Sequence, residues 1–256
     1  MQKLSKRLEA AAELISLKGG IVADIGTDHG YLPVYLIQSG RCKSAIALDV
    51  NKGPLERARQ YIKKNRLELV IQTRLSDGFA ALKRGEVNSV AITGMGGSLA
   101  VQILENGMEQ LSAVKELVIG AQSDILKVRE FLYCNGIYID KEDLVYEDGK
   151  FYPLLHGVWE KPAYWQEAGY IPFQKELRKK LPDASLYRKT LCQYGEYLLY
   201  KKDPALFKLL GRDEKIKRRI LDSLSRTRQK EAAKSRQAEL EAQLKGILAF
   251  LDFFNK

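Results

Sequence analysis

The first 160 residues alternate short apolar runs with helical patterns, and this alternation constrains the fold more than any other feature of the chain. The apolar runs are rich in β-branched residues and read GIVADIG, SAIALDV, LVIQTRL, VNSVAIT and ELVIG. Helical patterns cover residues 31–39, 54–65, 98–106 and 125–135. Strands that alternate with helices in this way predict a doubly wound parallel sheet with helices on both faces.

The pattern changes after Gly136. Residues 137–160 read IYIDKEDLVYEDGKFYPLLHGVWE, which is two extended runs around Asp148-Gly149, a dipeptide that favours a hairpin turn. A parallel sheet that ends in an antiparallel hairpin is typical of Rossmann-like class I methyltransferases, whereas dinucleotide dehydrogenases usually continue with further parallel units. By this analogy the sequence predicts the methyltransferase arrangement.

The two parts of the chain differ in charge. The 256 residues include 42 Lys and Arg against 32 Asp and Glu, and residues 1–160 contain 20 basic and 20 acidic side chains. The whole net charge of +10 therefore belongs to residues 161–256. Because neutralisation of phosphates by Lys and Arg drives nucleic-acid binding, we expect a polyanion as partner. A solubilising basic helix is the alternative.

The C-terminal part is interrupted by three early prolines and is almost wholly helical beyond Pro204. Its apolar residues recur at spacings of three and four, in one group of Ile216, Ile220 and Leu224 and another of Leu240, Leu244, Ile247, Leu251 and Phe254. This pattern predicts two helices, separated by residues 226–236, that fold back as a coiled-coil-like hairpin. A cap on the sheet and a dimerisation coiled coil are alternatives. The predicted domains cover residues 1–160 and 161–256.

Several classes of protein are disfavoured. No run approaches eighteen apolar residues, and the amphipathic start carries Glu9 and Glu13, so neither a membrane span nor a signal peptide is expected and a cytoplasmic location follows. The three cysteines, Cys42, Cys134 and Cys192, form no CxxC pair. We expect buried or half-buried thiols, no disulfide framework and no metal site.

The stretch DIGTDHGYLP follows the first predicted strand and resembles a nucleotide-binding glycine turn. A carboxylate within such a turn would repel a pyrophosphate, and this turn carries Asp24 and Asp28. S-adenosyl-L-methionine has no phosphate and carries a sulfonium and an ammonium, which carboxylates attract. The turn therefore predicts an S-adenosylmethionine site, with cofactor-binding candidates Asp24, Gly26, Thr27, Asp28, His29 and Gly30.

The ends of the next three strands extend this prediction. Asp49, followed by Val50, ends the second strand, where an acid commonly accepts the ribose hydroxyls of an adenosine. Ser76, Asp77 and Gly78 end the third strand, where Asp77 would receive the adenine amino group, and Gly94, Met95 and Gly96 end the fourth. In an open α/β sheet ligands bind at the carboxyl ends of the strands, so these residues should converge on one crevice.

In this order and spacing, DIGTDHGYLP, ALDVNKGPLERA, SDG and ITGMGG resemble the TrmK-type bacterial tRNA (adenine-N1) methyltransferases. The resemblance continues through QSDILKVREFLYCNGIYIDKEDLVYEDGKFYPLL and GEYLLYKKDPALFKLL, nearly the whole chain. It implies a Rossmann-like catalytic domain, a helical C-terminal domain and methylation of N1 of adenine 22 in tRNA. The chain departs from the family at Asp49, where Glu is usual, and at Gly120-Ala121, where Gln-Pro is usual.

The candidate catalytic residues are Asp28, His29 and Tyr31. Asp28 could stabilise the charge that develops on adenine. His29 could hydrogen-bond the substrate or orient that acid, or alternatively cap the next helix. Tyr31 could stack on a flipped base, with a place in the core as the alternative.

Two further features bear on the chemistry. The bare loop over residues 94–97 stands where enzymes that methylate exocyclic amines carry Asn or Asp before Pro-Pro and an aromatic residue, which disfavours amino acceptors. His156 lies in an apolar strand and is expected to be a core or edge residue.

Two other functions stay open at this stage. One is a small-molecule methyltransferase whose helical appendage is structural, and the other is a non-catalytic RNA-binding protein that retains the cofactor fold. We expect a monomer or weak homodimer.

Overall fold

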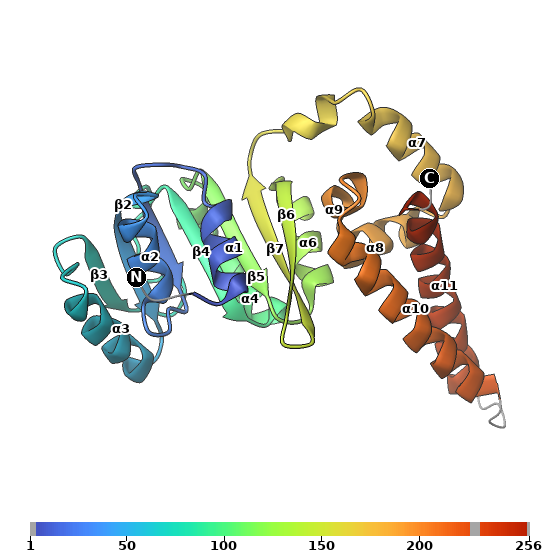
Figure 1. Ribbon diagram of the computed structural model, residues 1–256, viewed down its shortest axis with the longest axis horizontal. Coiled ribbons are helices and arrows are strands. Elements are labelled where there is room, and N and C mark those ends of the chain that lie inside the picture. Colours follow the sequence, from blue (N-terminus) through green and yellow to red (C-terminus); the bar gives the residue numbers. More distant parts are fainter. Residues whose placement is uncertain (1–3, 226–230, 255–256) are drawn as a thin grey trace. The chain divides into compact units, whose positions relative to one another are not determined.

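The computed structural model of the protein describes residues 4–225 and 231–254. The chain divides into two compact units, Met1–Pro162 and Ala163–Lys256, and Figure 1 shows a sheet with flanking helices in the first and helices alone in the second.

A seven-stranded sheet forms the first unit, in the order β3-β2-β1-β4-β5-β7-β6. Neighbours among the first five strands pair in parallel, and β7 pairs antiparallel with both β5 and β6. The strands are β1 Gly20–Ile25, β2 Cys42–Asp49, β3 Ile71–Leu75, β4 Ser89–Met95, β5 Glu116–Ala121, β6 Tyr138–Glu147 and β7 Lys150–Val158. The predicted doubly wound sheet and its terminal hairpin are confirmed.

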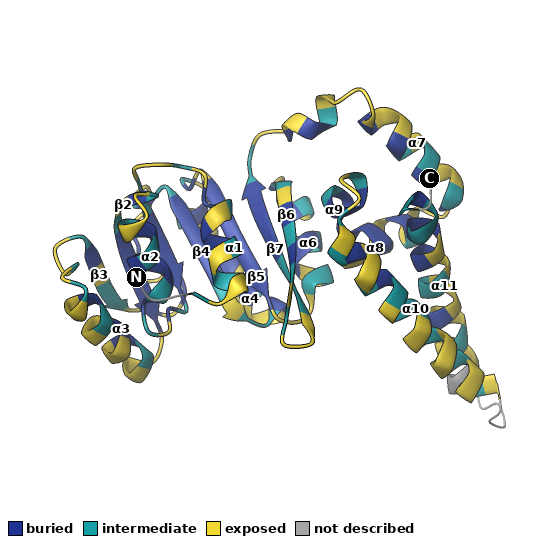
Figure 2. Ribbon diagram, viewed as in Figure 1, coloured by how far each residue is buried: buried dark blue, intermediate teal, exposed yellow. Residues whose placement is uncertain are grey.

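Helices cover both faces of this sheet. They are α1 Lys6–Leu14, α2 Tyr31–Gln38, α3 Lys52–Lys64, α4 Gly97–Asn106, α5 Met108–Leu111 and α6 Ile125–Cys134. Buried residues of α1, α2 and α3 share one apolar core, and those of α4, α5 and α6 share another. Adjacent residues of β2 alternate between them, with Ala45 and Ala47 in the first core and Ile46 and Leu48 in the second. Figure 2 shows the central strands buried and the outer side of α3 exposed.

Element boundaries differ from the sequence expectation by a few residues. The third strand begins at Ile71 rather than Leu69, whose side chain is fully exposed. Helix α3 begins at Lys52, two residues before Pro54, which lies in the first turn where a missing N–H breaks no helical hydrogen bond.

The end of α1 is tied to the sheet by a buried carboxylate at the start of β5. Glu116 accepts hydrogen bonds from the backbone N–H of Ser16 at 3.0 Å, the Ser16 hydroxyl at 2.6 Å and the Ser89 hydroxyl at 2.6 Å. His156 in β7 lies between Glu116, 3.0 Å from Nε2, and Asp140, 2.5 Å from Nδ1. His156 is therefore a buried core residue, one of the two places predicted for it, and its acidic partners were not predicted.

The second unit is helical throughout its described length. Its elements are the 3₁₀ turn η1 Ala163–Gln166, α7 Tyr170–Lys180, α8 Ala184–Tyr194, α9 Glu196–Tyr200, α10 Pro204–Ser225 and α11 Glu231–Phe254. The rings of Tyr164, Tyr170, Phe173 and Tyr200 pack at centroid distances of 5.2 to 6.1 Å. An aromatic core thus joins its shorter helices.

Helices α10 and α11 pack against each other in opposite directions, because Phe207 near the start of α10 contacts Phe254 at the end of α11, with 5.3 Å between ring centroids. Lys217 also donates to Oε1 of Gln243 across the pair at 2.9 Å. The sequence predicts residues 226–236 as the segment between the two helices, but α11 already begins at Glu231. Residues 226–230 lie outside the described part of the chain.

The cysteines follow the expectation in part. Cys42 and Cys192 are buried, but Cys134 is exposed because it is the last residue of α6, where the helix faces solvent. Over residues 4–225 and 231–254, no helix is long and apolar enough to cross a membrane. The same residues contain no group of three or more His, Cys, Asp or Glu side chains placed to hold a metal ion.

Candidate functional site

The turn after β1 is held at the edge of the sheet by its own backbone. The N–H groups of Gly26 and Thr27 both donate to the carbonyl of Leu48, at 2.8 and 2.9 Å. Gly26 has a φ of +82°, and a Cβ there would lie 2.6 Å from the terminal methyl of Met95. The positive φ favours glycine at this position, which lets the chain reverse and present Asp28 and His29 beyond the strand.

Asp24 is the buried acid of this turn, with 4% of its surface exposed. Burial raises the pKa of its carboxyl group to about 6, the neighbouring Thr27 side chain opposes that rise, and the charge of Asp49 adds to it. A cation placed at Asp24 would favour the ionised form, which burial disfavours.

Asp49 ends β2 and is almost fully buried, and its Oδ1 accepts the N–H of Asn51 at 2.7 Å. Its charge acts on Asp24, so the acids after the first two strands lie near one another, as the strand-end argument expects. Next to it, Val50 is 60% exposed at the sheet edge.

The residues after the third and fourth strands differ in burial and in their contacts. The buried Ser76 hydroxyl donates to the carbonyl of Gly78 at 2.9 Å and accepts the N–H of Ala81 at 3.0 Å, so this side chain serves its own turn. Asp77 is exposed beside it. After β4, Gly94 has a φ of +83° with open space where a Cβ would point.

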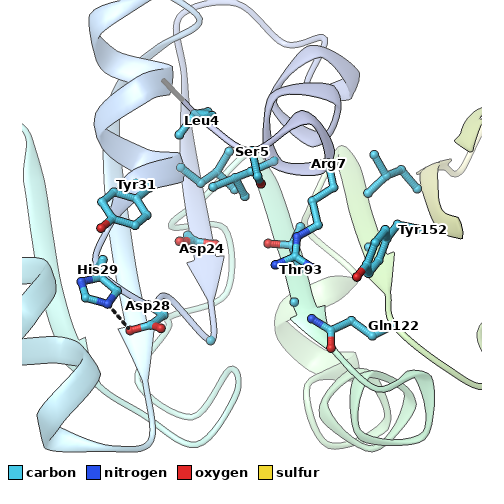
Figure 3. Close-up of a pocket in the computed structure, with 16 residues that line it drawn as sticks. Leu4, Ser5, Arg7, Asp24, Asp28, His29, Tyr31, Thr93, Gln122 and Tyr152 are labelled. Carbon is cyan, nitrogen blue, oxygen red and sulfur yellow. Dashed lines mark ion pairs between the residues drawn. The ribbon is translucent and has the colours of Figure 1, made fainter. Parts of the chain in front are cut away.

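A pocket of about 490 Å³ opens at these strand ends (Figure 3). Of the residues proposed from sequence, it is lined by Asp24, Gly26, Asp28, His29, Tyr31 and Gly94. The others lie along the same turns outside its lining: Thr27, Gly30, Asp49, Val50, Ser76, Asp77, Gly78, Met95 and Gly96. The structure thus separates the expected residues into a pocket group and a neighbouring group.

Sequence reasoning missed the opposite wall of this pocket. That wall contains Leu4, Ser5, Arg7 and Leu8 at the start of α1, Gln122 after β5, and Tyr152 and Leu154 in β7. Arg7 places its guanidinium carbon 4.9 Å from the centre of the Tyr152 ring and its Nε 3.8 Å from Oε2 of Glu147. Gln122 could have been found, because it follows β5 as the other candidates follow their strands.

Asp28, His29 and Tyr31 form the facing wall. The Asp28 side chain is 61% exposed, accepts from Nη2 of Arg57 at 2.9 Å and lies 3.5 Å from Nε2 of His29 (dashed in Figure 3). The His29 and Tyr31 rings stack with centroids 5.1 Å apart and planes 6° apart. Because Gly30 occupies the N-cap of α2 and His29 is engaged with these two neighbours, the capping alternative is disfavoured.

A parallel sheet in this strand order, with an antiparallel β7 and acids after β1 and β2, defines the class of Rossmann-like methyltransferases. The methyltransferase domain family matches residues 4–155, more than half of the chain. The tRNA (adenine(22)-N(1))-methyltransferase of Bacillus subtilis strain 168 is 38% identical over 153 residues, which cover 60% of this chain and 64% of that relative. The sequence match therefore spans slightly less than two thirds of the relative's length.

Solved structures match over almost the whole chain. The crystal structure of the B. subtilis m1A22 tRNA methyltransferase TrmK superposes with a TM-score of 0.82 at 28% identity and covers 98% of this chain and 100% of its own. M. capricolum TrmK, solved with S-adenosylhomocysteine, has a TM-score of 0.78 at 25% identity and covers 99% and 100%. The chain belongs to the TrmK family of tRNA (adenine-N1) methyltransferases.

Proposed function

We propose that this protein transfers a methyl group from S-adenosylmethionine to N1 of adenine 22 in tRNA. The observation that carries the proposal is the pocket, which places a buried acid, an exposed acid and a stacked aromatic wall at the strand ends of a TrmK family member. All of the residues that line it belong to the first unit.

The residues at the strand ends fit this cofactor. The Asp24 carboxyl, its pKa raised to about 6 by burial, suits the cofactor's ammonium group, since a nearby cation stabilises the ionised form. Asp49 would accept the ribose hydroxyls, and Asp77 would receive the adenine amino group. When bound, S-adenosylmethionine supplies a methyl group on a positively charged sulfur.

The other cofactor-binding candidates would contribute mainly their backbone. Gly26, Gly94 and Gly96 would let the chain come close to the cofactor. The remaining candidates would form the turns around it: Thr27, Gly30, Val50, Ser76, Gly78 and Met95.

The chain has a limited chemical task in this reaction. N1 of adenine carries a lone pair at neutral pH, so in-line placement matters more than a strong base. The Asp28 carboxylate would stabilise the positive charge that the adenine ring gains, although its ion pair with Arg57 offsets part of that effect. His29 would orient Asp28, and Tyr31 would offer its ring to the extruded base.

The basic second unit would bind the tRNA. The excess positive charge of the chain lies in residues 161–256, and phosphate contacts from such a unit could offset the cost of extruding the target base. A tRNA substrate also favours a cytoplasmic location. We expect the protein to be a monomer or a weak homodimer.

The test is incubation of the protein and S-adenosylmethionine with unmodified tRNA that carries adenine at position 22. Nucleoside mass spectrometry, under conditions that avoid alkaline rearrangement, should find 1-methyladenosine. Asp28→Asn should lower the methylation rate while tRNA affinity measured by filter binding changes little. A methyl group on N6, on guanine, on a small metabolite or on nothing contradicts the proposed reaction, whereas an unchanged rate for Asp28→Asn contradicts only the role of Asp28.

A further inference from the structure

Gln122 contributes a carboxamide group to the lining of the pocket. It follows β5 directly, its side chain is exposed, and Figure 3 shows it across the pocket from Asp28, below Tyr152. Among the described residues that line the pocket, no other carries an amide side chain. A carboxamide offers a hydrogen-bond donor and an acceptor side by side in one plane.

The backbone on both sides of Gln122 is fixed by the neighbouring loop. The N–H of Gln122 donates to the carbonyl of Met95 at 2.9 Å, and the N–H of Gly97 donates to the carbonyl of Ser123 at 2.9 Å. A Cβ at Gly97 would lie 2.6 Å from the carbonyl oxygens of Ser123 and Asp124, so the loops after β4 and β5 pack backbone to backbone. The backbone of Gln122 is therefore fixed to the loop after β4 at the strand ends.

The position of the reaction limits how adenine can be read. A side chain paired with N1 would block the nitrogen that must accept the methyl group. The other polar edge of adenine presents the N6 amino group as a donor and N7 as an acceptor, and Gln or Asn pairs with both at once. Guanine presents O6 and N7 on that edge, two acceptors that a carboxamide cannot match.

Four other polar side chains of the pocket, those of Arg7, Asp28, Ser5 and Thr93, do not offer this pattern. Arg7 has donors only, and it is engaged by Glu147 and the Tyr152 ring. Asp28 in its ionised form has acceptors only, and it is engaged by Arg57. The hydroxyls of Ser5 and Thr93 each present a single polar atom and cannot span two positions of a base.

We propose that Gln122 is the residue that selects adenine, with its carboxamide pairing to N6–H and N7 of the target base while N1 stays free. This assignment rests on the proposed function and adds to it the group that reads the base.

Replacement of N7 by carbon tests the pairing at a single atom. A tRNA assembled with 7-deazaadenosine at position 22 keeps N1 and N6 but lacks the N7 acceptor. The full-length wild-type protein should methylate it with a kcat/KM about tenfold lower, the usual effect of losing one hydrogen bond. Gln122→Ala should be slower on the normal tRNA and should react equally with both substrates.

Gln60→Ala, at an exposed position of α3 outside the pocket, is the matched control and should keep both the wild-type rate and the preference for N7. If the wild type forms 1-methyladenosine but is indifferent to N7, or if Gln122→Ala still prefers N7, the assignment of Gln122 is overturned and the proposed function stands. If the wild type forms no 1-methyladenosine on normal tRNA, both fall together.

Discussion

At the scale of single residues, the buried Asp24 carboxyl group lowers the stability of the fold at neutral pH. Its folded-state pKa of about 6 lies above the ordinary value of 3.8, so the native protein holds this proton more tightly than the unfolded chain. The ionised form therefore costs stability above pH 6, by about 3 kcal/mol for a shift of this size, and that cost disappears below pH 3.8. A cationic ligand at the carboxylate would recover part of it.

The corresponding prediction concerns Asp24→Asn. At pH 7 this variant should be more stable than the wild type by about 1 to 3 kcal/mol, because it removes a buried charge, and the difference should vanish near pH 4. Its affinity for S-adenosylmethionine should be lower and independent of pH, whereas the wild-type affinity should fall as the pH drops below 6. Urea unfolding and calorimetry at pH 4 to 7 measure both effects. A variant that is less stable than the wild type at pH 7, or that binds the cofactor equally well, would contradict this role.

Whether a pocket residue could be predicted depends on whether local sequence alone places it. Asp24, Asp28 and His29 were predictable because one turn after one strand places them, and local sequence defines that turn. Arg7 and Tyr152 reach the pocket from elements far apart in sequence, and the charge and ring of an isolated residue carry no signal of that meeting. Packing of α1 against the sheet creates this part of the site.

At the scale of elements, the position of α1 depends on the Glu116 and His156 pair. Burial would raise the pKa of Glu116, but hydrogen bonds from His156, Ser16 and Ser89 hold it at about 2. Burial would likewise lower the pKa of His156, but hydrogen bonds to Asp140 and Glu116 raise it to about 9. The Glu116 contribution to stability is lost as the pH falls from 4.5 toward 2, and that of His156 is lost as the pH rises from 6.5 through 9.

We predict that His156→Gln reveals this dependence. The loss in free energy of unfolding relative to the wild type should be largest at pH 6 and should shrink by about 3 kcal/mol by pH 10, since the shift spans about 2.5 units. Urea unfolding of both proteins at pH 6, 8 and 10 gives the difference directly. If the difference in free energy of unfolding stays constant with pH, neutral and charged His156 stabilise the fold equally and the prediction is wrong.

The elements themselves were largely predictable, and their partners were not. Period and turn residues place the seven strands and most helices to within a few residues, because burial on one or two faces determines which side chains a strand or helix can carry. The amphipathic pattern of residues 6–14 shows that one face is buried but not which sheet face covers it. That choice depends on long-range contacts such as Ser16 with Glu116, which no local pattern records.

At the scale of the whole molecule, the chain separates neutral and basic parts into different units. The boundary expected near Lys161 and the observed division after Pro162 lie together, because composition, prolines and packing all change there. Every residue that lines the pocket falls between Leu4 and Leu154, and the entire charge excess falls after residue 160. Cofactor binding and tRNA binding should therefore be separable.

The last prediction follows from this separation. A chain that ends at Pro162 should bind S-adenosylmethionine with the dissociation constant of the full-length protein, because it keeps the whole pocket and both apolar cores of the sheet. It should lose most of its tRNA affinity, since the remaining residues carry equal numbers of basic and acidic side chains up to residue 160. In the full-length protein, tRNA affinity should fall at least about tenfold between 50 and 200 mM salt, because released counterions drive phosphate contacts. Calorimetry measures the affinity for S-adenosylmethionine, and filter binding at the two salt concentrations measures the affinity for tRNA. Circular dichroism confirms that the shortened chain is folded. Tight, salt-insensitive tRNA binding by the shortened chain would contradict this prediction and assign the RNA-binding surface to the first unit.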